Sequence, residues 1–133
     1  MDLVLAPGIL EDVIRCAREA YPLEACGLLV GRNTGDRFIP ITNISSQANE
    51  YEMDPAELIA ALRSLRETGE RLLGIFHSHP HGPAEPSETD VERAYYPDAA
   101  HLIVSLADPG SPQAVAFRIV DGGILPVELR VIV

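Results

Sequence analysis

The order in which apolar and amphipathic segments follow one another limits the fold most. Residues 25–31 (ACGLLVG) and 71–76 (RLLGIF) read as short buried strands. Each follows an amphipathic segment of helical period, over residues 7–21 and from Asp54 to Gly69. Three further strand segments come late in the chain, in hairpin-like succession. Helices that alternate with buried strands, followed by a run of strands, predict a mixed α/β sheet with helices packed against it.

Local signals place the ends of the predicted elements. The first helix has Pro7 near its first turn and is stopped by Pro22. The second has Asp54 as N-cap and Pro55 at its first helical position, and it ends at Gly69. The remaining predicted elements are a strand over 37–44, a short helix from Ser87 to about Tyr95, and strands over 101–106, 114–120 and 124–133. No linker or repeat is visible, so we expect a single domain over residues 1–133.

Composition narrows the class of protein. The 133 residues are 47% hydrophobic, which is typical of a folded domain, and the formal net charge is -10. Phosphate binding needs a patch of Lys and Arg, which is absent here, so we expect no nucleic-acid partner. The sequence contains no run of about 18 apolar residues, so we expect no membrane span. The N-terminus lacks the features of a secretory signal. Two cysteines without a CxxC pair favour a reducing, cytoplasmic setting.

The segment His77-Ser78-His79-Pro80 carries most of the chemical information. Residues at i and i+2 of an extended backbone project from the same side, so both imidazoles can converge on one ion. A catalytic zinc site uses three protein ligands plus water, and Asp90 supplies a carboxylate if the proline-rich loop 80–86 folds back. The pair also suits two polar residues at a strand end, and Ser87-x-x-Asp90 also suits a capping box. Local chemistry leaves both interpretations open.

A resemblance to a known family favours the zinc-site interpretation over the purely structural one. The segment HSHPHGPAEPSETD (77–90) resembles the signature of the JAMM/MPN+ (JAB) zinc metalloproteases, H-x-H-P, six residues, then S-x-x-D. That signature comes with an upstream glutamate before a strand, and Glu24 stands there in a segment, EACGLLVG, similar to that of the short prokaryotic members. The similarity extends to Met53-Asp54-Pro55 and to the strand HLIVSL, and so covers nearly the whole chain.

The resemblance implies a fold and a set of roles. The fold would be the JAMM, cytidine-deaminase-like α/β architecture. His77, His79 and Asp90 would bind one Zn²⁺ per chain, Glu24 would be the general base, and Ser87 would donate to the oxyanion of the tetrahedral intermediate. The implied function is hydrolysis of a peptide or isopeptide bond after the tail of a ubiquitin-like or sulfur-carrier protein.

Two alternatives remain at this point. One is an endopeptidase of phage-tail or cell-wall type. The other is a noncatalytic MPN-type scaffold, although such modules typically lack zinc ligands that this chain retains. A deaminase is disfavoured because its H-x-E and P-C-x-x-C ligands are absent.

His81 is expected to be a solvated loop residue and Cys26 to pack in the core. The sequence defines no oligomeric state.

Overall fold

The amphipathic segments form helices and the apolar segments form strands. The computed structural model describes residues 2–133. Its elements in chain order are β1 (Asp2–Leu5), α1 (Ile9–Ala20), β2 (Cys26–Gly31), β3 (Arg37–Ile41), α2 (Pro55–Thr68), β4 (Arg71–His79), α3 (Glu88–Glu92), β5 (Ala100–Ser105), β6 (Gln113–Val120) and β7 (Gly123–Val131). None of the helices within these residues is both long enough and apolar enough to cross a bilayer.

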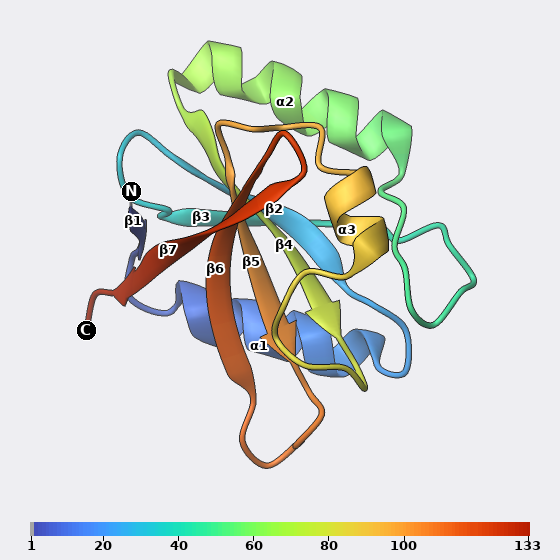
Figure 1. Ribbon diagram of the computed structural model, residues 1–133. Helices are drawn as coiled ribbons and strands as arrows, with labels where there is room; N and C mark the ends of the chain where they lie inside the picture. The colour runs from blue at the N-terminus through green and yellow to red at the C-terminus, as the bar shows by residue number, and fades with distance from the viewer. Residues whose placement is uncertain (1) are drawn as a thin grey trace.

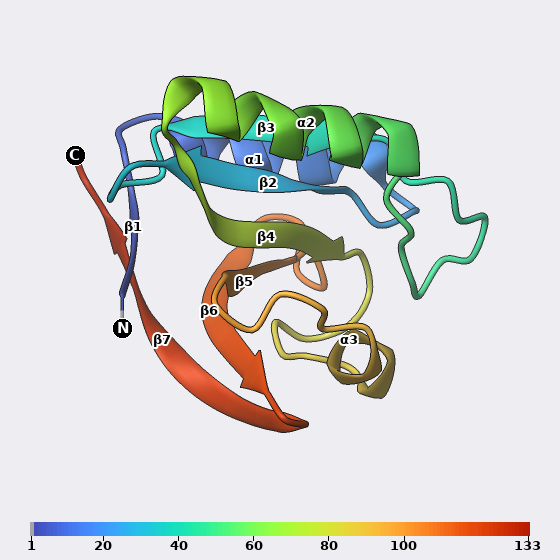
Figure 2. The same ribbon diagram turned by 90° about the horizontal axis from the view of Figure 1, so that it is seen from above.

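The strands form one curled, mixed sheet in the order β1-β7-β6-β5-β4-β2-β3 (Figures 1 and 2). Strand β4 lies inside the sheet, antiparallel to β2 and parallel to β5. The β5–β6 and β6–β7 pairs are antiparallel, and β1 joins β7 in parallel. The predicted mixed sheet flanked by helices is confirmed.

The two long helices cover opposite faces of the β2–β4 region, with α2 above it and α1 below it in Figure 1. Side chains alternate between faces along a strand. Leu29 and Phe76 therefore pack in the cluster that includes α1, whereas Leu28 and Ile75 pack in the cluster that includes α2. Two apolar clusters thus hold the central strands from both sides.

Helix α2 begins and ends where the sequence predicts. The Asp54 carboxylate accepts from the N–H groups of Ala56 at 2.9 Å and Glu57 at 3.2 Å. At the other end Gly69 adopts a left-handed conformation (φ 73°), and its N–H donates to the Leu65 carbonyl at 2.9 Å. These bonds satisfy backbone groups that a helix end otherwise leaves unpaired.

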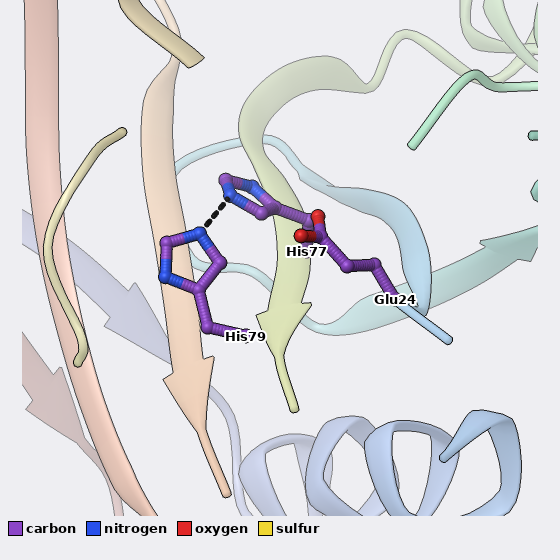
Figure 3. Close-up of side chains that lie close together, drawn as sticks. All are labelled: Glu24, His77 and His79. Atoms are coloured by element: carbon purple, nitrogen blue, oxygen red, sulfur yellow. Dashed lines mark hydrogen bonds between the residues drawn. The ribbon is translucent and has the colours of Figure 1, made fainter. Parts of the chain in front are cut away.

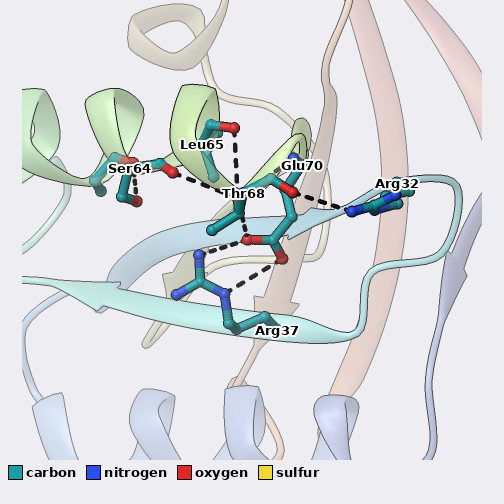
Figure 4. A network of polar contacts seen from close by, with 7 residues as sticks. Arg32, Arg37, Ser64, Leu65, Thr68 and Glu70 are labelled. Carbon is teal, nitrogen blue, oxygen red and sulfur yellow. Dashed lines mark hydrogen bonds and ion pairs between the residues drawn. The ribbon is translucent and has the colours of Figure 1, made fainter.

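A polar network ties the end of α2 to the hairpin between β2 and β3 (Figure 4). Arg37 donates to both carboxylate oxygens of Glu70, at 2.8 and 3.4 Å, and the Thr68 hydroxyl donates to Glu70 at 2.8 Å. Arg32 donates to the Thr68 carbonyl at 3.2 Å. Exposed ion pairs contribute little free energy, so this network mainly fixes the start of β4.

The structure differs from the sequence-based prediction at several places. Helix α1 begins at Ile9 with Gly8 as N-cap, so Pro7 lies before the helix and not in its first turn. Strand β1 was not predicted, because its pairing partner β7 lies more than a hundred residues away and only tertiary structure brings them together. Strand β4 continues to His79 rather than ending at residue 76, and β3 ends at Ile41 rather than 44. Helix α3 ends at Glu92 because none of its residues is buried, so no apolar face holds a further turn.

Candidate metal centre

The histidine pair lies at the end of β4, in the last three residues of the strand. His77 pairs with Cys26 of β2 on one side and with Ile103 of β5 on the other. The Nε2 atoms of His77 and His79 are 3.0 Å apart, and both side chains are buried. The sequence-based expectation that the two imidazoles converge is therefore met by the geometry.

Asp90 reaches this pair from α3. Its Oδ2 atom lies 3.0 Å from Nε2 of His77 and 3.1 Å from Nε2 of His79. The same oxygen accepts from the Ser87 N–H at 2.9 Å, while the Ser87 hydroxyl oxygen accepts from the Asp90 N–H at 3.1 Å. The Asp90 carboxylate thus takes part in the capping box and also contacts both histidines. The capping hydrogen bonds hold it in the position where it meets them.

The loop between β4 and α3 sets the tautomer of His79. Its Nδ1 lies 2.7 Å from the carbonyl oxygen of Pro83. A carbonyl can only accept, so Nδ1 must carry the proton. In the neutral ring Nε2 then keeps a free lone pair, directed at Asp90 and His77. Such a carbonyl behind the ring is the usual support of a metal-binding histidine.

Glu24 lies beside the two histidines (Figure 3). A carboxylate oxygen of Glu24 and a ring nitrogen of each histidine all lie within 4.8 Å of one another. Glu24 is only 3% exposed, and its Oε1 has no hydrogen-bond partner among residues 2–133. Burial raises the pKa of this carboxyl from 4.5 to about 7, which His79 partly opposes.

These groups fit a divalent metal such as zinc. Two imidazole nitrogens and one carboxylate oxygen converge within 3.1 Å of one another, and zinc takes this donor set in catalytic sites. The contacts with both histidines hold the pKa of Asp90 well below its ordinary value against the opposing effect of burial, so it stays ionised. The unpartnered Glu24 oxygen leaves one buried acceptor beside the cluster for a further polar molecule.

Two residues that the sequence did not single out hold Glu24 in place. The Ser78 hydroxyl oxygen accepts from the Ala25 N–H at 2.8 Å, and the Ser78 N–H donates to the Ala25 carbonyl at 3.0 Å. Asn43 donates its side-chain N–H to the Glu24 carbonyl at 2.9 Å. Ser78 stands inside the histidine motif and could have been suspected from that. Asn43 lies just after β3 and carries no local signal.

The ring of Tyr51 packs against the ring of His77. The two rings are stacked, with centroids 4.7 Å apart and planes 24° from parallel. Burial raises the pKa of Tyr51, so its phenol stays neutral. The segment around Tyr51 is polar and predicted as a loop, so nothing local to the sequence indicated this contact.

Ser87 has a free donor as well as its capping role. Its hydroxyl oxygen accepts from the Asp90 N–H, whereas a hydroxyl offers one donor and two acceptor positions. The O–H can therefore donate elsewhere while the cap stays intact. Capping and catalysis, which the sequence presented as alternatives, are compatible in this geometry.

His81 and Cys26, the other two residues considered from the sequence, and three further side chains lie as follows. His81 is exposed and its ring meets Tyr21 edge-on at 5.2 Å, away from the cluster. Cys26 is buried in the core, as predicted, and burial raises its thiol pKa to about 12. Tyr96 packs against the α2-side cluster, whereas Tyr95 is exposed. His101 lies in β5 and is buried; burial and the nearby His77 lower its pKa to about 4.

Comparison with known proteins agrees with this geometry. Residues 7–120 match the model of the Prok-JAB family, described as prokaryotic homologs of the JAB domain. The chain is 35% identical over 133 residues to the CysO-cysteine peptidase of Mycobacterium tuberculosis, covering 98% of this chain and 91% of that protein. It is 34% identical to the desampylase of Haloferax volcanii, over 77% of this chain and 80% of that one. A solution structure of a Desulfitobacterium hafniense protein superimposes with a TM-score of 0.87 at 38% identity, covering 98% and 92% of the two chains.

The matched region contains every segment that builds the site, from the glutamate before β2 to the aspartate of α3. Fold and site together define a peptidase of the JAMM class. Within that class the chain belongs to the Prok-JAB family, the short prokaryotic type.

Proposed function

We propose that the chain hydrolyses the amide or isopeptide bond that follows the C-terminal tail of a ubiquitin-like or sulfur-carrier protein, using one Zn²⁺. The observation that carries this is the convergence of His77, His79 and Asp90 beside the unpartnered carboxylate of Glu24. Two relatives, a CysO-cysteine peptidase and a desampylase, support this substrate class. The two cysteines are free thiols, which suits the reducing cytoplasmic setting that we also propose.

His77, His79 and Asp90 would hold the zinc. When bound, zinc acts as a Lewis acid and makes hydroxide accessible near neutral pH. The Pro83 carbonyl and the Ser87 N–H keep His79 and Asp90 in ligating orientation before any ion arrives. Prior orientation of this kind is what metal sites gain from the groups behind their ligands.

Glu24 would move the proton. Its carboxylate accepts a proton from the attacking water and delivers it to the departing amine, as a general base and then a general acid. A base works best when its pKa lies near the working pH, and burial moves Glu24 in that direction. Ser87 would donate its free O–H to the oxyanion that forms on the scissile carbonyl.

A tail ending in two glycines suits this cleft. The end of β4 and the loop 80–86 flank the site, and the scissile carbonyl must pass close to both. Glycine has no side chain and can pass such walls, leaving its main-chain groups free to pair with a strand edge.

The test is cleavage of defined conjugates by the zinc-loaded protein. One carrier ends in Gly-Gly joined to cysteine or, through an isopeptide bond, to lysine; the matched carrier has Ala-Val in place of Gly-Gly. We expect cleavage of the first carrier only. Cleavage of an unrelated peptide but of neither carrier would favour the endopeptidase alternative. Absence of bound zinc and of any cleavage would favour a scaffold.

A further inference from the structure

A cavity adjoins the metal centre on the α2 side of the sheet. It has a volume of about 430 Å³ and shares His77 and Asp90 with the centre. Tyr51, Met53, Leu58 and Tyr96 form its apolar walls. Small-molecule sites typically have volumes of about 300–1,000 Å³, so the cavity can hold an amino-acid residue. No role in the proposed mechanism uses this space.

The floor of the cavity carries a buried polar group without a partner. His101 is 3% exposed, and neither of its ring nitrogens has a hydrogen-bond partner among residues 2–133. His101 pairs with Ile75 across β4 and β5, so it lies on the same face as His77. An unpaired buried donor or acceptor costs free energy, whereas an aliphatic side chain would fill this position at no such cost. The group is therefore placed to meet a ligand.

The walls are fastened to each other. Arg93, just after α3, forms an ion pair with Glu50 at 3.2 Å and donates to the Tyr51 carbonyl at 3.5 Å. This clamp joins the wall that carries Tyr51 to the wall formed by α3 and the segment after it. Both contacts come from Arg93 and join the two walls at the rim of the cavity.

The position of the cavity indicates which part of a substrate would enter it. A diglycine tail on the acyl side has no side chain near the scissile carbonyl. The nearest acyl-side side chain would lie two residues away, about 7 Å along an extended chain. A cavity that shares two of the metal-ligating side chains is therefore within reach mainly of the leaving side, the residue whose nitrogen departs.

The chemistry of the lining selects among leaving residues. The lining carries charged groups of both signs, Glu52, Asp90 and Arg93, so charge alone does not select the leaving side chain. A lysine linked through its ε-nitrogen brings only methylenes next to the bond and leaves His101 unpaired. A neutral imidazole offers one donor and one acceptor, which a hydroxyl or thiol can use.

We propose that this cavity binds the α-linked residue on the leaving side of the scissile bond, and that His101 favours a side chain carrying a hydroxyl or thiol. The inference rests on the proposed function, since it takes the acyl side to be a glycine tail. His101 is then a specificity-determining residue in contact with the substrate.

The experiment compares carriers that end in Gly-Gly followed by a single residue. Cysteine, serine, alanine, threonine and its isostere valine would be tested, together with lysine joined through its ε-nitrogen, and kcat/KM would be measured for each. For the unchanged protein we expect serine over alanine and threonine over valine by about tenfold, the effect of one added hydrogen bond in a buried site. His101→Leu should remove both preferences, so that serine and alanine carriers are cleaved at equal rates, and threonine and valine carriers likewise. His101→Gln, which retains a donor and an acceptor, should restore part of each preference.

The outcomes separate two failures. Cleavage of all carriers at similar rates by the unchanged protein would overturn this inference and leave the proposed function standing. An equal loss for every carrier in His101→Leu would mean a structural role and would also overturn it. Failure to cleave any carrier would overturn the proposed function and this inference with it. Zinc content and thermal unfolding report on folding of both variants, and His101→Gln supplies the comparison if His101→Leu does not fold.

Discussion

Ser78 and Ala25 exchange two hydrogen bonds, N–H to hydroxyl oxygen at 2.8 Å and N–H to carbonyl at 3.0 Å, beyond the end of the β2–β4 ladder. Ser78 stands between the two histidines, and Ala25 follows Glu24. The pair therefore couples the segment that carries the proposed general base to the strand that carries the two proposed histidine ligands. The serine in the middle of the motif thus links the position of Glu24 to that of the histidines.

Ser78→Ala should lower turnover by tens of fold and keep the zinc. The Ala25 N–H loses its acceptor, which costs about 1–3 kcal/mol of stability, and Glu24 loses its placement, on which rate depends steeply. Ser78→Thr retains the hydroxyl and should recover activity. Ser64→Ala is a matched control, because Ser64 donates within α2 to the Ala61 carbonyl, far from the site. Equal turnover in Ser78→Ala and Ser64→Ala would contradict the coupling.

The double variant His77→Ala/His79→Ala should bind no zinc. Metal analysis of the unchanged protein should give about one zinc per chain, and zinc at 100 times its dissociation constant should stabilise the fold by about 2.7 kcal/mol. The double variant should show neither. His81→Ala is the control, since this exposed histidine lies outside the cluster and should leave both properties intact. Stoichiometric zinc in the double variant would refute the ligand assignment.

Glu24→Gln should retain zinc and lose turnover by about 10²–10⁴-fold, the usual effect of removing a general base. Glutamine keeps the shape of the side chain but cannot accept the proton. Single-turnover rates and zinc content, measured on the same preparation, check this. Near-normal turnover would make Glu24 a buried acid without a catalytic task.

The same substitution should change the pH dependence of stability in the zinc-free protein. The folded-state pKa of Glu24 is raised from 4.5 to about 7, so between these values the folded state binds more protons than the unfolded state. The free energy of unfolding therefore falls as pH rises through this window. Glu24→Gln lacks this loss, and its stability relative to the unchanged protein should rise by about 1–3 kcal/mol from pH 4.5 to pH 8. Urea unfolding with a chelator present measures it; a difference that stays constant with pH would contradict the shift.

Ser87→Ala should affect rate more than stability. Loss of the oxyanion donor costs about 10²–10³ in turnover, whereas loss of the cap costs about 1 kcal/mol. Asp54→Ala is the matched control, because Asp54 caps α2 and has no catalytic role. We expect both variants to melt earlier and only Ser87→Ala to lose turnover. Unchanged turnover in Ser87→Ala would mean that Ser87 caps α3 and has no role in catalysis.

Local sequence patterns were sufficient for elements whose signals are local. Asp54 and Gly69 mark the ends of α2 because a cap and a left-handed glycine act within a few residues of the helix they end. The histidine pair was readable for the same reason, since alternation along a strand puts residues at i and i+2 on one face.

Contacts that depend on tertiary structure could not be predicted from the sequence. Asp90 needed a family resemblance, because S-x-x-D is equally a capping box, and it is in fact used as one. Asn43 and Tyr51 come from the connection between β3 and α2, and His101 comes from β5, all without any motif. Their roles follow from the packing of α2 and α3 on the sheet, which no local pattern encodes.

The parallel pairing of β1 with β7 has a consequence for synthesis on the ribosome. Asp2 pairs with Glu128, so the earliest strand to emerge waits for one of the latest, whereas Glu24, the histidines and Asp90 have all emerged long before. Closing so long a loop is entropically expensive, and contacts of high sequence separation form slowly. Until β7 is available, Leu3 lacks its pairing partner Leu129, and Leu5 has only its isolated bridge to Gly35. We therefore expect the nascent chain to gather its zinc ligands before its N-terminal strand is docked.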